Sequence, residues 1–184
     1  MRIISGKLRG RQFDTPSGDT TRPTGDKVRG ALFNILQSRL QGARVLDGFA
    51  GSGALSFEAL SRGAASATLF ETDAAAAALL RQNALKLGIA GQCDIRKLDF
   101  LVGAAALGNA AYDIVFLDPP YGAGLLEKVI TFMDWQGLLA PGGIIVAEYS
   151  AANNMPADIN GLAAYDSRIY GITALIFYRR QDSK

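Results

Sequence analysis

The chain has 184 residues, with 19 Lys and Arg against 17 Asp and Glu, a single cysteine and no histidine. Without histidine it cannot form a Ser-His-Asp or Cys-His catalytic pair, a His-ligated metal site or an imidazole proton shuttle. With Cys93 alone, it has no internal disulfide and no cysteine cluster for zinc or an iron–sulfur centre. We therefore expect no metal, and chemistry that relies on carboxylates, amides, hydroxyls, aromatic rings, backbone dipoles or a bound cofactor.

The size and composition of the chain predict one globular domain, an enzyme or a binding protein. Nearly half of the residues are apolar and a fifth are charged, which is typical of a folded domain. The first residues lack the apolar core of a signal peptide, and no apolar run approaches the roughly 18 residues that cross a bilayer. We expect a cytoplasmic protein that is not associated with membranes.

The net charge of +2 is an average over two unlike parts. Residues 1–44 hold nine Lys and Arg against three Asp, a net charge of +6, and the remainder carries −4. A basic leading segment on a mildly acidic body predicts that the leading segment contacts a polyanion. The alternative is a solvated, solubilising segment.

The first residues predict a short β-hairpin followed by a loop. Residues 2–5 and 12–14 flank a turn with glycine at both ends and cations between. Pro16, Gly18 and Pro23 interrupt regular structure after it. A helix is predicted from Thr24 as its N-cap, with apolar residues at helical spacing as far as Leu40.

From Gly42 onward, apolar strands alternate with amphipathic or alanine-rich helices. The predicted strands are Arg44–Phe49, Ala67–Glu71, Asp94–Lys97, Asp113–Leu117 and Ile144–Glu148. The predicted helices are Ala54–Arg62, Ala74–Leu87, Phe100–Leu107 and Leu125–Met133. This alternation predicts a parallel sheet with helices on both faces. Leu162–Tyr170 and Thr173–Arg179 predict an antiparallel hairpin at its edge.

The loop after the first strand is a candidate ligand loop, because ligands of open parallel sheets lie beyond the carboxyl ends of the strands. It runs from Asp47 through Phe49, Ala50, Gly51, Ser52 and Gly53 into a helix. Its glycines are spaced Gly-x-x-Gly-x-Gly, unlike the Gly-x-Gly-x-x-Gly dinucleotide fingerprint. Asp47 would repel a pyrophosphate and attract an ammonium group.

The next two strands also end in carboxylates. Glu71, followed by Thr72, can accept both hydroxyls of a ribose. Asp99 can accept from an adenine amino group, while Phe100 covers the ring. Each feature taken alone also fits a simple turn, a helix cap or a core residue; three in succession favour a nucleoside-like cofactor with an ammonium group.

The fourth strand leads into Asp118, Pro119, Pro120 and Tyr121. The two prolines fix the loop and leave their carbonyl groups free to accept hydrogen bonds. Asp118 adds another acceptor and Tyr121 a flat surface, so the loop predicts a receptor for a planar group that bears an NH₂. The alternative is a rigid proline turn with a packed tyrosine.

These motifs resemble the class I S-adenosylmethionine-dependent methyltransferases that modify exocyclic amines of nucleobases. The leading Arg-Ile-Ile-Ser-Gly, Arg22-Pro23-Thr24, Val28-Arg29 and residues 32–36 are similar to the RsmD family, which methylates the N2 amine of one guanine in 16S ribosomal RNA. The resemblance covers nearly the whole chain. It implies a Rossmann-like, seven-stranded, mostly parallel sheet with an antiparallel last strand, and S-adenosyl-L-methionine as the methyl donor.

The resemblance also implies site roles and partners. Asp118 and the Pro119 carbonyl would hold the amine, and Tyr121 would stack on the base. Residues 1–23 would form a basic hairpin arm and residues 24–184 the methyltransferase domain, acting as a monomer on 16S rRNA or a small-subunit assembly particle. The candidate phosphate contacts are Lys7, Arg9, Arg11, Arg22 and Arg29.

Several other functions stay open at this stage. An adenine-N6 methyltransferase acting on DNA or RNA, or a protein-amine methyltransferase, would share the pocket but normally needs an added recognition domain. A pyrimidine-C5 enzyme needs a cysteine nucleophile, and Cys93 lies before the third strand without a preceding proline. A non-catalytic RNA-binding module would not need the Asp-Pro-Pro-Tyr loop.

Overall fold

The computed structural model describes residues 1–16, 25–107, 111–119 and 123–181. Its α-helices are α1 Asp26–Ile35, α2 Ala54–Ser61, α3 Ala74–Leu87, α4 Phe100–Ala104 and α5 Ala123–Trp135. Its strands are β1 Arg44–Asp47, β2 Ser66–Glu71, β3 Cys93–Lys97, β4 Tyr112–Leu117, β5 Leu139–Ser150, β6 Asp158–Ile159, β7 Leu162–Tyr170 and β8 Thr173–Arg180. Short 3₁₀ turns follow α1, α3 and α4. Within these ranges no helix is both long and apolar enough to cross a membrane.

One sheet in the order β3-β2-β1-β4-β5-β8-β7-β6 forms the centre of the molecule. The first five strands are parallel, and β8 joins β5 in antiparallel register, with Ile144 opposite Arg179 and Ser150 opposite Thr173. The predicted α/β class and the antiparallel last strand are confirmed. The predicted count of seven is wrong: the described residues contain eight strands, because Asp158–Ile159 turns at Asn160-Gly161 and pairs with the start of β7.

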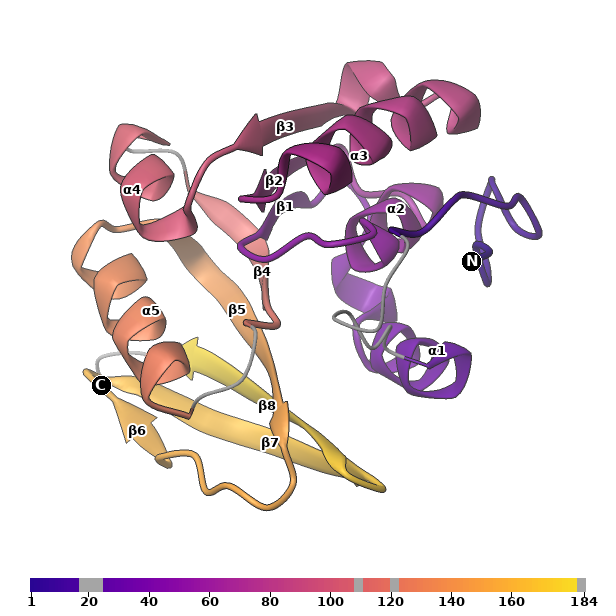
Figure 1. Cartoon of the computed structure of the whole chain (residues 1–184). Coiled ribbons are helices and arrows are strands. Elements are labelled where there is room, and N and C mark those ends of the chain that lie inside the picture. The colour runs from indigo at the N-terminus through magenta and orange to yellow at the C-terminus, as the bar shows by residue number, and fades with distance from the viewer. Residues whose placement is uncertain (17–24, 108–110, 120–122, 182–184) are drawn as a thin grey trace.

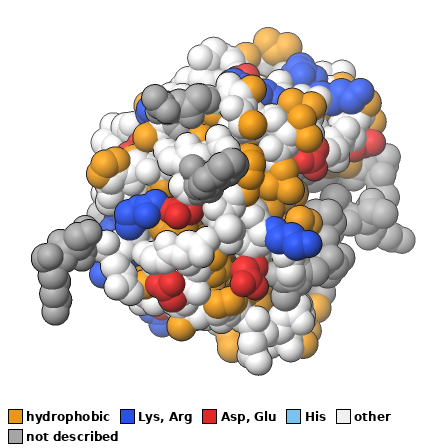
Figure 2. Space-filling model, turned by 90° about the vertical axis from the view of Figure 1, so that its left-hand side faces the viewer, with side chains coloured by type: hydrophobic (Ala, Val, Ile, Leu, Met, Phe, Trp, Pro, Cys, Tyr) orange, Lys and Arg blue, Asp and Glu red, His pale blue; other side chains and the backbone are white. Residues whose placement is uncertain are grey.

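Helices cover both faces of the sheet, and two buried clusters follow this division (Figure 1). Val45, Leu69 and Ile114 pack toward α1, α2 and α3. Leu46, Val115 and Ile145 point to the opposite face, under α4 and α5. The alternation follows from the two-residue period of a strand. Figure 2 looks onto the α4 and α5 side, where exposed hydrophobic side chains lie among scattered charges.

The observed bounds of the elements agree with the predicted ones except where loops carry ambiguous signals. The strand Leu162–Tyr170 and the helix Ala74–Leu87 coincide with their predictions. The fifth strand starts earlier than predicted, because Leu139 already pairs with Tyr112 of β4; after an irregularity in the register, pairing continues from Ile144. The predicted N-cap Thr24 lies outside the described residues, and α1 begins after Gly25 without a side-chain cap.

The N-terminal segment is packed against the body of the molecule. Arg2 and Gln12 form an antiparallel bridge, in place of the full predicted hairpin strands. Ile3, Leu8 and Phe13 are buried in the cluster beneath α2 and α3. Three buried side chains thus anchor residues 1–16 to the body of the molecule.

Contacts to α2 hold this segment in place. The buried Glu58 carboxylate accepts from the backbone N–H groups of Ile4 and Ser5, at 2.7 and 3.0 Å. The Lys7 N–H donates to the Ser61 carbonyl at 2.8 Å. Gly6 has φ +84°, and a Cβ there would lie 2.0 Å from the same carbonyl oxygen, so only glycine fits this approach.

Candidate active site

Five carboxylates lie at the carboxyl ends of five adjacent strands. In the register of the sheet, Asp47 pairs with Leu69 of β2 and Phe116 of β4, and Leu117 pairs with Ala147 of β5. The residues at and just after the carboxyl ends of these parallel strands therefore lie at the same edge of the sheet. The set is Asp47, Glu71, Asp99, Asp118 and Glu148. The sequence-predicted cofactor and catalytic acids are therefore brought to one edge of the molecule.

Asp47 is the most buried of these acids, at 3% exposure. Its Oδ2 accepts a hydrogen bond of 2.8 Å from the Ser56 hydroxyl, and the Phe49 N–H also donates to it. Burial raises the pKa of Asp47 to about 6, although both hydrogen bonds oppose that change. A cation bound at this edge would restore the carboxylate form.

The glycine loop turns between Asp47 and α2 with its backbone directed at Glu71. Glu71 accepts from the Gly51 N–H at 2.9 Å and from the Asp73 N–H at 2.8 Å. Gly51 has φ +50° and open space where a Cβ would lie. Gly53 has φ +77°, and a Cβ there would lie 2.6 Å from Leu80 and 2.7 Å from Phe57. The loop thus packs tightly beneath Gly53 and stays open above Gly51.

The remaining predicted loop residues surround this opening. Ala50 is buried and donates its N–H to the Phe70 carbonyl, which ties the loop to β2. Ser52 is half-buried, with its hydroxyl 3.6 Å from the Met1 sulfur. Thr72 is exposed beside Glu71. The loop therefore contacts both β2 and the N-terminal segment.

Asp99 and Phe100 both make contacts within the protein at the start of α4. Asp99 caps α4, since its Oδ1 accepts from the N–H groups of Leu101 and Val102; within the described residues, Oδ2 stays open. Phe100 is 2% exposed and packs edge-on to Phe70 at 5.4 Å between ring centroids. The expectation that Phe100 covers an adenine ring does not fit this burial. Phe49, whose ring centroid lies 6.1 Å from that of Phe100, is only half-buried and belongs to the glycine loop.

Asp118 directly follows β4 and lies close to Glu148 and Asp47. Burial, together with the negative charges of Glu148 and Asp47, raises the pKa of Asp118 to about 8. Pro119 is buried next to it. The predicted Pro120 and Tyr121 lie outside the described residues. The edge therefore places Asp118 close to two other partly or fully buried acids.

This geometry agrees with comparisons to known proteins. The family model described as "Conserved hypothetical protein 95" matches residues 1–179. The chain belongs to this family. It is 39% identical over 98% of its length to "Ribosomal RNA small subunit methyltransferase D" of Escherichia coli K12, and covers 90% of that protein. The resemblance to the RsmD family is thereby confirmed, and the chain is a member of a methyltransferase family.

Solved structures show the same fold. The structure of yhhF from Escherichia coli superposes with a TM-score of 0.88 at 36% identity, covering all of this chain and 99% of the other. An RNA methyltransferase of Salinibacter ruber, solved with S-adenosyl-L-homocysteine, has a TM-score of 0.68 at 17% identity over 89% of this chain and 97% of that one. The second likeness concerns the fold alone. The chain has the class I methyltransferase fold.

The polar groups at this edge of the sheet fit S-adenosyl-L-methionine. A nucleoside that carries an ammonium and a sulfonium group needs hydrogen-bond acceptors for its ribose hydroxyls and negative charge near its cationic groups. The edge offers the Glu71 carboxylate and the buried Asp47, and the open space above Gly51 lets a ligand approach the backbone. A phosphate-bearing ligand would be repelled by the same carboxylates.

The predicted RNA contacts lie elsewhere. Lys7 donates to Gln92, just before β3, and Arg11 donates to the carbonyls of Lys86 and Leu87 at the end of α3. Arg9 is exposed on the turn between them. These cations surround the amino end of β3, at the opposite end of the sheet from the carboxylates. Arg22 lies outside the described residues.

The position of Arg29 contradicts its predicted contact with an RNA phosphate. Its side chain is fully buried, and Nη2 donates to the Arg2 carbonyl at 2.7 Å and to Asp26 at 3.0 Å. Burial lowers its pKa in spite of the neighbouring acids. A guanidinium enclosed in this way presents no donor to a phosphate, so Arg29 anchors the N-terminal segment.

Three residues that position the site or the N-terminal segment were not predicted from the sequence. Ser56 holds Asp47 from α2, and its only sequence signal is a polar residue on an apolar helix. Glu148 is the last residue of the fifth predicted strand, so the rule that identified the other acids at strand ends could have found it. Glu58, three residues before the end of α2, is fully buried and gives no such signal.

Proposed function

We propose that the protein transfers a methyl group from S-adenosyl-L-methionine to the exocyclic N2 amine of a guanine in 16S ribosomal RNA. The observation that carries the proposal is the meeting of Asp118 with Asp47 and Glu71 at one sheet edge, in a chain 39% identical to a protein named as an rRNA small subunit methyltransferase. When bound, S-adenosyl-L-methionine supplies an electrophilic methyl group carried by a sulfonium.

On the cofactor side, Glu71 accepts the ribose hydroxyls and Asp47 provides negative charge for the cationic part of the ligand. Both carboxylates are held by backbone or hydroxyl donors, so their positions are set before binding. The open Oδ2 of Asp99 accepts from the adenine amino group, and Phe49 contributes the exposed apolar surface.

On the acceptor side, the Asp118 carboxylate and the Pro119 carbonyl accept the hydrogens of the guanine amine. The amine lone pair is delocalised into the ring, so the amine is a poor nucleophile until these acceptors orient it. Orientation of this kind lowers barriers by up to about 7–11 kcal/mol. The methylated amine releases one proton, which Asp118 or water takes up. In this proposal Tyr121 stacks on the base and Pro120 stiffens the loop.

The target base must leave its stack to reach the edge, which is easiest in a loop or an unpaired region. Residues 1–23 contribute the RNA contacts through Lys7, Arg9, Arg11 and Arg22, and residues 24–184 carry the catalysis. Because Lys7 and Arg11 lie at the far end of the sheet, a folded RNA that spans the molecule fits this arrangement better than a short single strand.

The test uses labelled S-adenosyl-L-methionine with naked 16S rRNA, partly assembled small subunits, DNA and protein as acceptors. We expect label in the rRNA of one or both ribosomal samples, and none with Asp118→Ala. Label confined to DNA or protein would contradict the proposal. Equal labelling by wild type and Asp118→Ala would contradict the role of Asp118.

A further inference from the structure

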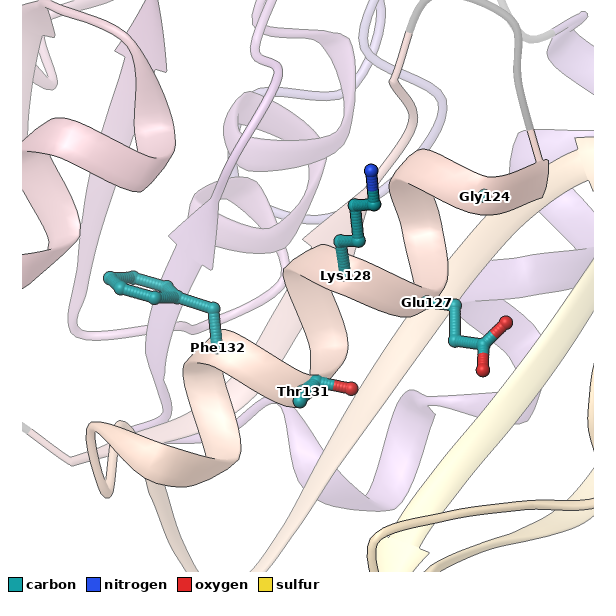
Figure 3. A pocket seen from close by; sticks show the side chains of 5 residues that line it. All are labelled: Gly124, Glu127, Lys128, Thr131 and Phe132. Carbon is teal, nitrogen blue, oxygen red and sulfur yellow. The ribbon is translucent and has the colours of Figure 1, made fainter.

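A hollow of about 550 Å³ lies along α5, outside the carboxylate edge. It is lined by Gly124, Glu127, Lys128, Thr131 and Phe132 (Figure 3). They lie on two adjacent rows of the helix surface, with Gly124, Lys128 and Phe132 on one row and Glu127 and Thr131 on the other. Figure 3 shows Lys128 and Phe132 directed to one side of α5, and Glu127 and Thr131 to the other.

The hollow starts next to the catalytic loop. Asp118 and Pro119 end the preceding described segment, and α5 begins at Ala123. Gly124, Lys128 and Phe132 form a row at four-residue spacing. At a rise of about 1.5 Å per residue, this row leads about 12 Å away from the loop. Gly124 has open space where a Cβ would lie, so nothing blocks the start of the row.

The row combines a cation with an aromatic ring. Lys128 is exposed and forms no ion pair with another described residue, whereas Asp134 on the same helix pairs with Arg180. Phe132 is half-buried, with part of its ring packed against the core. A basic group beside an aromatic surface is the pattern that binds single-stranded nucleic acid, by phosphate contact and base stacking.

We propose that this row binds the nucleotide next to the target guanine, with Lys128 on its phosphate and Phe132 against its base. The inference rests on the proposed function, because it assumes an RNA substrate whose target base enters at Asp118. It places an RNA contact on the α5 side of the sheet, away from Lys7, Arg9 and Arg11. The two groups of cations would then hold the RNA at both ends of the molecule.

The test measures RNA binding without turnover, by titrating the full chain with a guanine-containing RNA oligonucleotide at several salt concentrations. Lys128→Gln should weaken binding several-fold and reduce the salt slope by about one. Lys128→Arg keeps the charge and should restore both. Phe132→Leu should weaken binding about tenfold and Phe132→Tyr little, because only tyrosine keeps an aromatic face.

A second oligonucleotide without bases on either side of the guanine separates the two contacts. With it, the Phe132→Leu effect should vanish while the Lys128→Gln effect persists. In methylation assays, Lys128→Gln should raise KM and leave kcat unchanged. If Phe132→Leu lowers thermal stability, the binding measurements with Lys128→Gln and Lys128→Arg alone test the subsite.

An unchanged salt slope in Lys128→Gln, or equal losses in Lys128→Gln and Lys128→Arg, would overturn the subsite. A wild-type chain that binds RNA in this Lys128-dependent way but methylates no guanine would overturn the proposed function and support the subsite. The two failures are therefore distinguishable.

Discussion

Asp118 is largely buried beside two other acids, so its substitution is the most informative single test of the proposed mechanism. Replacing it by alanine removes the acceptor that orients the amine. We expect Asp118→Ala to lower kcat by at least about 100-fold, in the range found when one polar group that stabilises a transition state is removed. The affinity for S-adenosyl-L-homocysteine, measured by calorimetry, should change little. A strong loss of that affinity would assign Asp118 to cofactor binding.

Ser56 is predicted to control the charge of Asp47. Its hydroxyl hydrogen bond favours the carboxylate, so Ser56→Ala should raise the pKa of Asp47 above its value of about 6. Cofactor binding should then weaken several-fold at pH 7 and recover at higher pH. The check is a series of S-adenosyl-L-methionine titrations between pH 6 and 9. A pH profile identical to that of the wild type would contradict the link.

At the residue scale, the sequence revealed acids that directly follow strands and concealed those that depend on packing. Asp47, Glu71 and Asp118 were predictable because a parallel sheet places all strand ends at one edge. The burial of Arg29 and Phe100 was not, since a basic residue and an aromatic residue have the same sequence signal whether they face a ligand or the core. Only the tertiary contacts separate these cases.

Among the elements, the N-terminal segment depends on Glu58 of α2. This fully buried carboxylate accepts from two backbone N–H groups and from Arg62 at 2.7 Å. Glu58→Ala leaves these donors without their acceptor and should lower the free energy of unfolding by about 3–5 kcal/mol. Hydrogen exchange at residues 3–8 should rise, as measured by mass spectrometry.

A matched control is available on the surface. Asp94→Ala removes an exposed ion pair with Arg96 and should cost less than about 1 kcal/mol. If Glu58→Ala were no more destabilising than Asp94→Ala, the N-terminal segment would not depend on this contact.

The elements themselves were largely predictable because their hydrophobic periods are clear. Ala74–Leu87 has a capping Asp73 before it and a left-handed Gly88 after it, and both ends follow from local chemistry. The two-residue strand Asp158–Ile159 has no such period, because its pairing depends on the neighbouring hairpin. The docking of residues 1–16 on α2 likewise depends on contacts between residues more than 50 positions apart.

For the whole molecule, the raised pKa values of Asp47 and Asp118 predict an unusual pH dependence. In the unfolded chain these carboxyls lose their protons near pH 4, and in the folded chain at about 6 and about 8. Between these values the folded state binds more protons, so stability should fall as pH rises from about 4 to 8. Thermal melts of the ligand-free protein check this, and Asp118→Asn should flatten the upper half of the curve.

Ligand binding should act in the opposite direction. A cationic ligand favours the ionised carboxylates, so binding of S-adenosyl-L-methionine should release protons and tighten as pH rises. S-adenosyl-L-homocysteine lacks the sulfonium charge and should show the smaller effect. Calorimetry in buffers of different ionisation enthalpy measures the protons released. Equal release by both ligands would contradict the influence of the sulfonium on these acids.

The charge asymmetry of the chain has a structural counterpart that the sequence alone did not provide. The acids of the body meet at the carboxyl edge, while Lys7, Arg9 and Arg11 lie at the amino end of β3. Residues 1–16 of the arm predicted from charge are therefore anchored to the body, with their cations on its surface. An RNA that contacts both regions must extend across the molecule, which favours a folded ribosomal substrate.

The identity of the methylated nucleoside is the most direct test of methyl transfer to the guanine N2 amine. Small-subunit rRNA is incubated with the protein and S-adenosyl-L-methionine, digested to nucleosides and examined by mass spectrometry. We expect N2-methylguanosine as the product, and none of it with Asp118→Ala. The appearance of N6-methyladenosine, or of a C5-methylated pyrimidine, in its place would contradict it.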